Sequence, residues 1–238
     1  MQRYFASIQN NQIILDESDV HHVLHVMRMK KGDEIEVVAN GKLYSFIIES
    51  TNPLNIVINY EIPSDSEISQ DITLFYTLAK GDKIDLVVQK ATELGVKKVV
   101  LLSSERCVVK WESKEVNKKL DRYQKIAKEA SEQSHRLVVP SIIGVYPLTN
   151  IPYELLADLN LFAYEKKAGN TKDLHELLEK CHQSVSVLVG PEGGFSEKEA
   201  KLVQEKYHFV PVSLGKRILR SETAAISALS IISFYLEK

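Results

Sequence analysis

The sequence predicts an α/β protein in which a small β-rich region precedes a larger domain with a mostly parallel sheet. Two observations carry this prediction. Over residues 1–70, apolar and polar residues alternate between turn signals, as in half-buried strands. From residue 72 onward, short apolar runs alternate with helical patterns, which is typical of a parallel sheet covered by helices. We therefore expect one domain at residues 1–70 and a second at residues 71–238.

The β-rich region contains a clear hairpin signal. Two strand patterns in "DEIEVVANGKLYSFIIES" flank Asn40-Gly41, a dipeptide that favours the tight turn of a hairpin. A further strand is expected in "STNPLNIVINYEIP", and "SDVHHVLHVMRM" fits a short helix. The polar stretch Pro63–Asp71 is rich in turn formers and poor in apolar residues, so it is the predicted linker.

The second domain begins with the strand "ITLFYTLA" and the helix "KIDLVVQKATELG". Asp82 is the expected N-cap of that helix, and Gly95 lies just past its end. The strand "VVLLSS" and a long helix from residue 113 to 134 follow. Three more strand–helix pairs complete the alternation: "LNLFAYE" with "TKDLHELLEKC", "VSVLVG" with "SEKEAKLVQEKY", and "FVPVSLG" with "SETAAISALSIISFYLEK".

The long helix has two distinct faces. At about 100° per residue one face is apolar and predicted to pack on the core. The opposite face is basic but also carries acidic residues, so it can be a phosphate-contacting stripe or, as we favour, ordinary solvated surface. The apolar face comprises Val116, Leu120, Tyr123, Ala127 and Ala130, and the basic face Lys114, Lys118, Arg122, Lys125 and Lys128.

The composition excludes several classes of protein. No apolar run is long enough to span a membrane, and the start of the chain lacks the pattern of a secretory signal. Cys107 and Cys181 are too few for a disulfide framework or a four-ligand zinc site, so we expect a cytoplasmic protein without a metal. The net charge of -2 gives no strong nucleic-acid signature by itself.

Two loops between a strand and a helix are the candidate binding elements. The first glycine loop, Gly190–Phe195, lies in "LVGPEGGFSEKE", where Ser196 and Glu199 form a predicted capping box. The second glycine loop, Ser213–Arg220, precedes a helix that Ser221 is expected to cap. Neither loop has the spacing of a dinucleotide or P-loop motif, because no two of the ten glycines are separated by a single residue and no G-x-x-x-x-G-K-[ST] occurs.

Together, "LVGPEGGFSEKE" and "LGKRILRSETAAISAL" resemble the ribosomal RNA small-subunit methyltransferase E family, a group of knotted SPOUT methyltransferases. The resemblance extends to "KGDKIDLVVQKATELGVKKVVLLSSERCVVK" and "NKKLDRYQKIAKEASEQSHRLVVP". At the N-terminus, "HHVLHVMRMKKGDEIEV" resembles the family's PUA-like RNA-binding domain. Two positions depart from the pattern: His135 stands where glycine is expected, and Ser221 where some relatives carry threonine.

The resemblance implies an enzyme that uses S-adenosyl-L-methionine to methylate N3 of uridine 1498 in the 16S rRNA of the small ribosomal subunit. It also implies a homodimer and a deep trefoil knot in the C-terminal domain, an exception to the near absence of knots in proteins. In the family, the knot and the cofactor site are formed by the two glycine loops and the turn after "LFAYE". The implied cofactor-binding residues are Gly190, Gly193, Gly194, Leu214, Gly215, Ile218, Leu219, Ser221 and Thr223.

The chemistry of uracil defines the catalytic candidates. N3 of uracil carries a proton at neutral pH, so the enzyme must remove it or stabilise the resulting anion. Arg220 or Arg217 is the candidate for the stabilising group, and Glu192 for orienting the base or accepting the proton; a purely structural role of Glu192 stays open. The candidate RNA-binding residues are Arg28, Arg106 and Lys110.

Two other functions are compatible with parts of the sequence. A non-catalytic RNA-binding module would explain the β-rich domain and the basic clusters, but it would not need two glycine loops. A knotted methyltransferase acting on another RNA position, such as a ribose 2′-OH or a transfer RNA, would keep the fold and change the target. The apolar residues around most of the last helix favour its burial on more than one side, as in a dimer interface.

Overall fold

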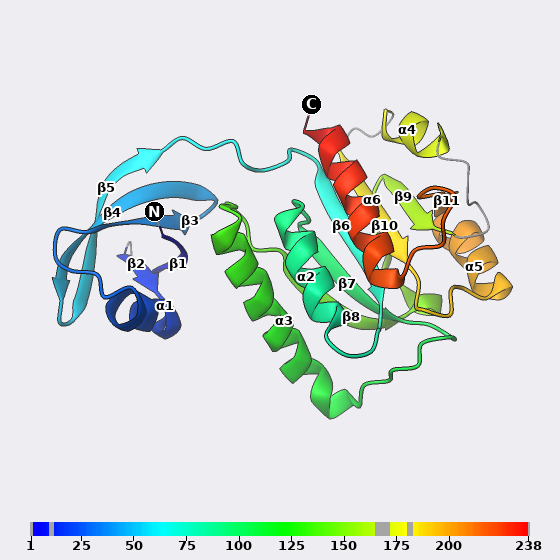
Figure 1. Ribbon diagram of the computed structural model, residues 1–238, viewed down its shortest axis with the longest axis horizontal. Helices are drawn as coiled ribbons and strands as arrows, with labels where there is room; N and C mark the ends of the chain where they lie inside the picture. Colours follow the sequence, from blue (N-terminus) through cyan, green and yellow to red (C-terminus); the bar gives the residue numbers. More distant parts are fainter. Residues whose placement is uncertain (1, 10–11, 165–171, 180–182, 238) are drawn as a thin grey trace. The chain divides into compact units, whose positions relative to one another are not determined.

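The computed structural model describes residues 2–9, 12–164, 172–179 and 183–237 (Figure 1). Two compact units make up the chain. The first unit comprises Met1–Glu67 and Ser131–Val138, and the second Ile68–Ala130 and Val139–Lys238. Cys181 and the predicted turn after Tyr164 lie outside the described residues.

The first unit contains a five-stranded sheet in the order β2-β1-β3-β4-β5. All pairs in it are antiparallel except β1 with β3. The predicted hairpin is confirmed, with Asn40 and Gly41 between β3 and β4 at φ values of 51° and 73°, which a tight hairpin turn requires. The strands are β1 (Arg3–Gln9), β2 (Gln12–Leu15), β3 (Glu34–Ala39), β4 (Lys42–Thr51) and β5 (Leu54–Ile62).

The predicted short helix of the first unit is present as two joined pieces. α1 (Glu17–His21) is capped by the Asp16 carboxylate, which accepts a hydrogen bond from the Asp19 amide, and it continues into a π-helical turn, η1 (His22–Val26). Val23 is fully buried and packs with Tyr4, Phe46 and other apolar residues of the sheet. The unit therefore has a hydrophobic core of its own.

The position of His135, where the resemblance predicts glycine, has a backbone explanation. His135 has a φ of 59°, a left-handed conformation that glycine adopts without steric cost. Its carbonyl oxygen accepts a hydrogen bond from the Arg3 guanidinium, and the neighbouring Arg136 pairs with Glu67 at 2.7 Å. These contacts hold the segment after the long helix within the first unit.

The second unit is built on a six-stranded sheet in the order β11-β9-β10-β6-β7-β8, with every neighbouring pair parallel (Figure 1). The predicted α/β fold with a mostly parallel sheet is confirmed. The strand β8, an edge strand, was missed by the sequence analysis. The strands are β6 (Asp71–Thr77), β7 (Lys98–Ser103), β8 (Ser141–Pro147), β9 (Leu159–Ala163), β10 (Ser184–Val189) and β11 (Val210–Val212).

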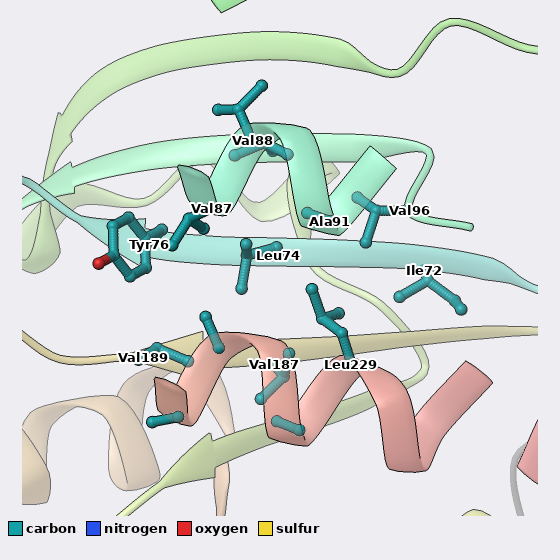
Figure 2. Packing of buried hydrophobic residues seen from close by; sticks show 14 of the residues in the cluster. Ile72, Leu74, Tyr76, Val87, Val88, Ala91, Val96, Val187, Val189 and Leu229 are labelled. Carbon is teal, nitrogen blue, oxygen red and sulfur yellow. The ribbon is translucent and has the colours of Figure 1, made fainter. Parts of the chain in front are cut away.

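Helices cover this sheet on both faces. α2 and α6 pack on one face with Leu74 and Tyr76 of β6, and Figure 2 shows part of this cluster. The other face, which includes Phe75 of β6, packs on α5. Both faces are buried, so the strands are nearly continuous apolar runs. The helices are α2 (Lys83–Glu93), α3 (Ser113–Gln133), α4 (Lys172–Leu178), α5 (Glu197–Tyr207) and α6 (Ser221–Leu236), with 3-10 turns η2 (Leu148–Asn150) and η3 (Tyr153–Leu155).

One predicted helix cap is confirmed in position and one is wrong. Asp82 holds the N-cap position of α2, but its side chain makes no capping hydrogen bond. Arg220, and not Ser221, is the N-cap residue of α6, because Ser221 is already helical and its hydroxyl is used elsewhere. The other end signals are confirmed: Gly95 follows α2 with a φ of 84°, and Ser196 caps α5.

The predicted apolar face of α3 is confirmed by its burial. Tyr123, Ala127 and Ala130 are buried, whereas Lys118 and Lys125 on the opposite face are exposed. Among the described residues, no helix is both long and apolar enough to cross a membrane.

Candidate functional site

A cavity of about 550 Å³ lies in the second unit, between the two glycine loops. Its walls follow the carboxyl ends of β9, β10 and β11 and the start of α2, the edge at which open parallel sheets bind ligands. The lining residues are Lys83, Ala163, Tyr164, Val189, Gly190, Pro191, Glu192, Gly193, Gly194, Phe195, Ser213, Leu214, Gly215, Arg217, Ile218, Leu219, Arg220, Ser221 and Ala224.

The first glycine loop is shaped by contacts with the protein itself. A Cβ atom at Gly190 would lie 2.9 Å from the ring of Phe195, which is buried under the loop. A Cβ atom at Gly193 would lie 3.3 Å from Cβ of Arg106. Gly194 has a φ of 64° and donates its amide to the Pro191 carbonyl at 2.9 Å. Two of the three glycines are therefore needed for tight packing of the loop, beyond any contact with a ligand.

The helix after this loop is firmly anchored. Ser196 and Glu199 form a complete capping box, in which the Ser196 hydroxyl accepts from the Glu199 amide and the Glu199 carboxylate accepts from the Ser196 amide. Both side chains are almost fully buried. The capping box fixes the point at which the loop enters α5.

The second glycine loop presents backbone, apolar and cationic groups to the cavity. Gly215 has a φ of 122°, which only glycine adopts readily, and a Cβ atom there would meet nothing within 4 Å. Ile218 is 81% exposed, an unusual value for an apolar residue on a cavity wall. Arg217 and Arg220 are also exposed and line the same space. This wall can contact an apolar ring and an anionic group at once.

Ser221 joins three segments around the cavity. Its buried hydroxyl donates to the Gly190 carbonyl at 2.7 Å and lies 3.1 Å from the hydroxyl of Tyr76, at the end of β6. Because a serine hydroxyl has one hydrogen, Tyr76 must donate to Ser221 while Ser221 donates to Gly190. Burial raises the pKa of Tyr76 to about 12, so this phenol stays protonated and able to donate.

Lys83 forms an ion pair with Glu192 at the cavity wall. The distance from Lys83 Nζ to Glu192 Oε1 is 2.9 Å, and Glu222 Oε2 on α6 lies 3.4 Å from the same ammonium. Burial acts to raise the pKa of Glu192. The hydrogen bond and charge of Lys83, together with backbone hydrogen bonds from Glu192 itself and Lys80, outweigh it, and the pKa lies below its usual value. The hydrogen bond to Glu192 in turn raises the pKa of Lys83.

Most of the predicted cofactor-binding residues come together in this cavity. Eight of the nine line it, and Thr223 does not: its side chain is exposed on α6, outside the lining. All three catalytic candidates, Glu192, Arg217 and Arg220, also line it. The eight cofactor candidates in the lining are Gly190, Gly193, Gly194, Leu214, Gly215, Ile218, Leu219 and Ser221.

The RNA-binding candidates lie outside the cavity lining. Arg106 donates a hydrogen bond to the Gly193 carbonyl at 2.8 Å, and Lys110 is exposed further along the same segment. Arg28 belongs to the first unit, where it is exposed after η1 with a φ of 54°. Their roles in RNA binding stay predictions.

The sequence analysis missed several residues of the site. Lys83, Tyr164 and Phe195 line the cavity and were not among the candidates. For Lys83 and Tyr164 a signal existed, since each follows a strand of the parallel sheet and the carboxyl ends of such strands converge. Phe195 carried no comparable signal, because an aromatic residue before a helix is ordinary core.

Two family models match the chain. The model described as "RNA methyltransferase domain" matches residues 66–233, and the model described as "RNA methyltransferase PUA domain" matches residues 15–59. The parallel sheet with its cavity and the separate β-rich sheet agree with these two matches. Fold and site thus define the class: an RNA methyltransferase domain preceded by a PUA domain.

Relatives that match over nearly their whole length identify the family within this class. Ribosomal RNA small subunit methyltransferase E of Bacillus subtilis is 35% identical, over 100% of this chain and 98% of its own length. The protein of that name from Aquifex aeolicus is 34% identical over 96% and 97%. The crystal structure of the Neisseria gonorrhoeae protein of that name, bound to S-adenosyl methionine, superposes with a TM-score of 0.84 at 30% identity, covering 98% of this chain and 97% of that one. The chain belongs to the ribosomal RNA small subunit methyltransferase E family.

Proposed function

We propose that the protein transfers the methyl group of S-adenosyl-L-methionine to N3 of uridine 1498 in the 16S rRNA of the small ribosomal subunit. The observation that carries this proposal is the cavity walled by both glycine loops, in a chain that belongs to this family. The relatives' names support a ribosomal RNA substrate. The choice of nucleotide and of ring atom rests on the family resemblance of the two loops.

The residues of the cavity fit the cofactor. Its volume of about 550 Å³ lies within the range of pockets that enclose small ligands. Leu214, Ile218 and Leu219 offer apolar contacts for an adenine ring, and the open space beside Gly215 leaves room for a ligand against the backbone. Backbone groups of the two loops supply hydrogen bonds. The cofactor supplies an electrophilic methyl group on a sulfonium, so the reaction needs no metal.

Arg217 and Arg220 address the main chemical difficulty. N3 of uracil must lose its proton, to solvent water in this proposal, before or during methyl transfer, and the negative charge then spreads onto O2 and O4. The N3–methyl bond would form as the bond from the methyl group to sulfur breaks, which would leave a neutral thioether. A fixed cation near those oxygens stabilises that charge and lowers the barrier. Both guanidinium groups lie on the cavity wall and are exposed to an entering base. We assign one to the uracil oxygens and the other to the flanking phosphate.

Glu192 acts as a positioning residue in this proposal, and the general-base alternative is less favoured. Its carboxylate is paired with Lys83 at 2.9 Å, and its pKa is lowered. A carboxylate with a lowered pKa is a weaker base, and the hydrogen bond must break before it can accept a proton. The ion pair instead fixes the first glycine loop to the start of α2.

The wider organisation follows from the same family membership. We propose that residues 1–70 form the PUA-like RNA-binding domain and residues 71–238 the methyltransferase domain, with a deep trefoil knot. Arg28, Arg106 and Lys110 contact RNA phosphates. The active form is a cytoplasmic homodimer, which exposed Phe234 and Ile231 on the outer side of α6 support.

The test is methylation of small ribosomal subunits and of naked 16S rRNA, each purified from cells that lack the endogenous enzyme. Digestion and mass spectrometry of the nucleosides should show N3-methyluridine, and mapping should place it at position 1498. Methylation of a ribose, or of another uridine, would overturn the assignment of the target. Glu192→Gln should keep most of the rate at saturating cofactor; a loss of rate of about a hundredfold or more with cofactor binding intact would restore the general-base role.

A further inference from the structure

The turn after β7 is attached to the first glycine loop and its helix by three hydrogen bonds. Arg106 Nη1 donates to the Gly193 carbonyl at 2.8 Å. The Ser196 hydroxyl donates to Glu105 Oε2 at 2.9 Å, and the Glu105 amide donates to Glu199 Oε1 at 2.7 Å. Two consecutive residues of one turn therefore hold the middle of the loop that walls the cavity and the start of the helix after it.

Close packing accompanies the hydrogen bonds. The nearest atom to a Cβ placed on Gly193 is Cβ of Arg106, and the backbone carbonyl of Arg106 lies 3.8 Å from the same point. The close approach of Arg106 Cβ therefore favours glycine at position 193, because a larger residue would push Arg106 away from the loop. On the other side, Gly193 faces the cavity. Gly193 thus contacts Arg106 and also lines the cavity.

The Glu105 contacts use buried groups. Ser196 and Glu199 are 8% and 7% exposed, and both also serve the capping box of α5. One oxygen of the Glu199 carboxylate accepts from the Ser196 amide, and the other accepts from the Glu105 amide. A buried carboxylate that accepts two amide hydrogens cannot shift without leaving one of them unsatisfied.

Arg106 itself stays exposed, although one of its donors is occupied. A guanidinium carries five N–H donors, so Arg106 can bind a phosphate while it still holds the Gly193 carbonyl. Lys110, in the same segment, is exposed as well, but no contact links it to the glycine loop among the contacts that the structure describes.

We infer that Arg106 is a positioning residue of the cofactor cavity: it holds the Gly193 wall of the first glycine loop in shape and ties that wall to the segment expected to contact RNA. This inference deepens the proposed function and rests on it. Because the same side chain touches the cavity wall and faces solvent, a phosphate bound to Arg106 stabilises the wall. Binding of RNA and of cofactor then strengthen each other, and by linkage the effect is reciprocal.

The test measures S-adenosyl-L-methionine binding by calorimetry in the absence of RNA, for the wild type, Arg106→Met, Arg106→Lys and Lys110→Met. Loss of the wall contact in Arg106→Met should weaken binding about fivefold, equivalent to about 1 kcal/mol. Arg106→Lys, which keeps the charge and one donor, should recover part of this loss. Lys110→Met removes a charge from the same segment without touching the wall, so its cofactor affinity should equal that of the wild type.

Two outcomes would overturn the inference. One is wild-type cofactor affinity in Arg106→Met. The other is an equal loss in Lys110→Met, which would indicate a general electrostatic effect. If the wild type itself binds no cofactor, the proposed function fails instead, so the two failures are distinguishable.

A second measurement covers the case in which Arg106→Met is poorly folded. Hydrogen exchange of the Gly194 amide, which donates to Pro191 within the loop, should accelerate in Arg106→Lys while amides in β6 and β10 keep wild-type rates. Unchanged exchange at Gly194 would show that Arg106 does not hold the loop. Adding a short RNA that contains the target uridine should tighten cofactor binding in the wild type, and by a smaller factor in Arg106→Lys. Equal tightening in both proteins would show that Arg106 does not couple RNA binding to cofactor binding.

Discussion

Lys83 forms an ion pair with Glu192, the carboxylate of the first glycine loop. The ammonium lies 2.9 Å from the carboxylate and lowers its pKa, so the carboxylate keeps its negative charge down to a lower pH. Glu222 shares the same ammonium at 3.4 Å, so one lysine serves two carboxylates from different segments. Removing Lys83 leaves two like charges near each other without compensation, whereas removing Glu192 leaves Lys83 paired with Glu222.

Lys83→Met should therefore change the acid dependence of stability. The folded-state pKa of Glu192 lies below its ordinary value of 4.5, so its contribution is fully present above pH 4.5 and is lost as pH falls through the lowered pKa. Lys83→Met removes the part of this contribution that comes from the ammonium, while the backbone hydrogen bonds to Glu192 remain. The fall in melting temperature as the pH drops below 4.5 should therefore be shallower than in the wild type. Thermal unfolding at several pH values measures it.

A matched control is Lys90→Met, which removes the partner of Glu93 on the same helix. That pair is also half-buried, but it links two residues three positions apart on one helix and no second segment, so it should contribute little and its acid profile should follow the wild type. Identical profiles for Lys83→Met and the wild type would show that the pair with Glu192 does not hold in solution.

Ser221 gives a second prediction at the level of a single residue. Ser221→Ala leaves the Gly190 carbonyl without its hydroxyl donor and the Tyr76 hydroxyl without its acceptor, both in a buried region. The expected loss in free energy of unfolding is about 2 kcal/mol, within the usual cost of an unsatisfied buried group. Ser221→Thr keeps the hydroxyl and should retain most of the stability. Urea unfolding measures all three proteins, and an equal loss in both variants would assign the effect to packing.

Among the helices, α5 has a first turn that is held by several side-chain hydrogen bonds. Its start is defined by the reciprocal hydrogen bonds of Ser196 and Glu199, and Glu105 from the turn after β7 adds two more contacts there. The C-terminal end lacks a glycine: His208 takes the left-handed conformation with a φ of 57°. The side-chain hydrogen bonds that fix the position of α5 therefore lie at its N-terminal end, next to the cavity.

Ser196→Ala should destabilise the protein by about 2 kcal/mol, at the upper end for an N-cap, because a tertiary hydrogen bond to Glu105 is lost together with the cap. Ser196→Asp restores a capping oxygen but places a carboxylate against Glu105, so it should recover less than Ser196→Asn. Chemical denaturation distinguishes the three. If Asp recovered as much as Asn, the contact with Glu105 would contribute nothing.

On the scale of the whole molecule, α6 presents apolar side chains on two sides. One side, with Ala225, Ala228 and Leu229, is buried against α2 and the sheet. Figure 2 shows Leu229 in this cluster. On the other side, Phe234 is 74% exposed and Ile231 40% exposed. Large exposed apolar residues on an otherwise buried helix favour an interface between chains.

Phe234→Glu should convert the proposed homodimer into monomers, because a carboxylate would have to be buried in the interface. Light scattering coupled to size exclusion gives the mass directly. Lys201→Glu, at an exposed side chain of α5, is a suitable charge-changing control and should leave the mass unchanged. A wild-type protein that elutes as a monomer at micromolar concentration would remove the homodimer from the proposal.

The sequence by itself determined the order of most strands and helices, the hairpin at Asn40-Gly41, the capping box of α5 and the two loops that wall the cavity. These features depend on local signals, since side-chain periodicity and turn residues act within a few positions of the chain. The edge strand β8 was missed because it is followed by 3-10 turns and not by a helix, so the alternation that revealed the other strands was missing.

Only the tertiary structure decided which distant residues meet at the cavity. The strand order β11-β9-β10-β6-β7-β8 brings the start of α2 and the turn after β7 beside a loop about a hundred residues later in the chain. The partners of Glu192, Gly193 and Ser221 are therefore Lys83, Arg106 and Tyr76, and no local pattern contains such pairs. The same reason explains why Gly193, expected to admit a ligand, is also the point where Arg106 packs against the loop.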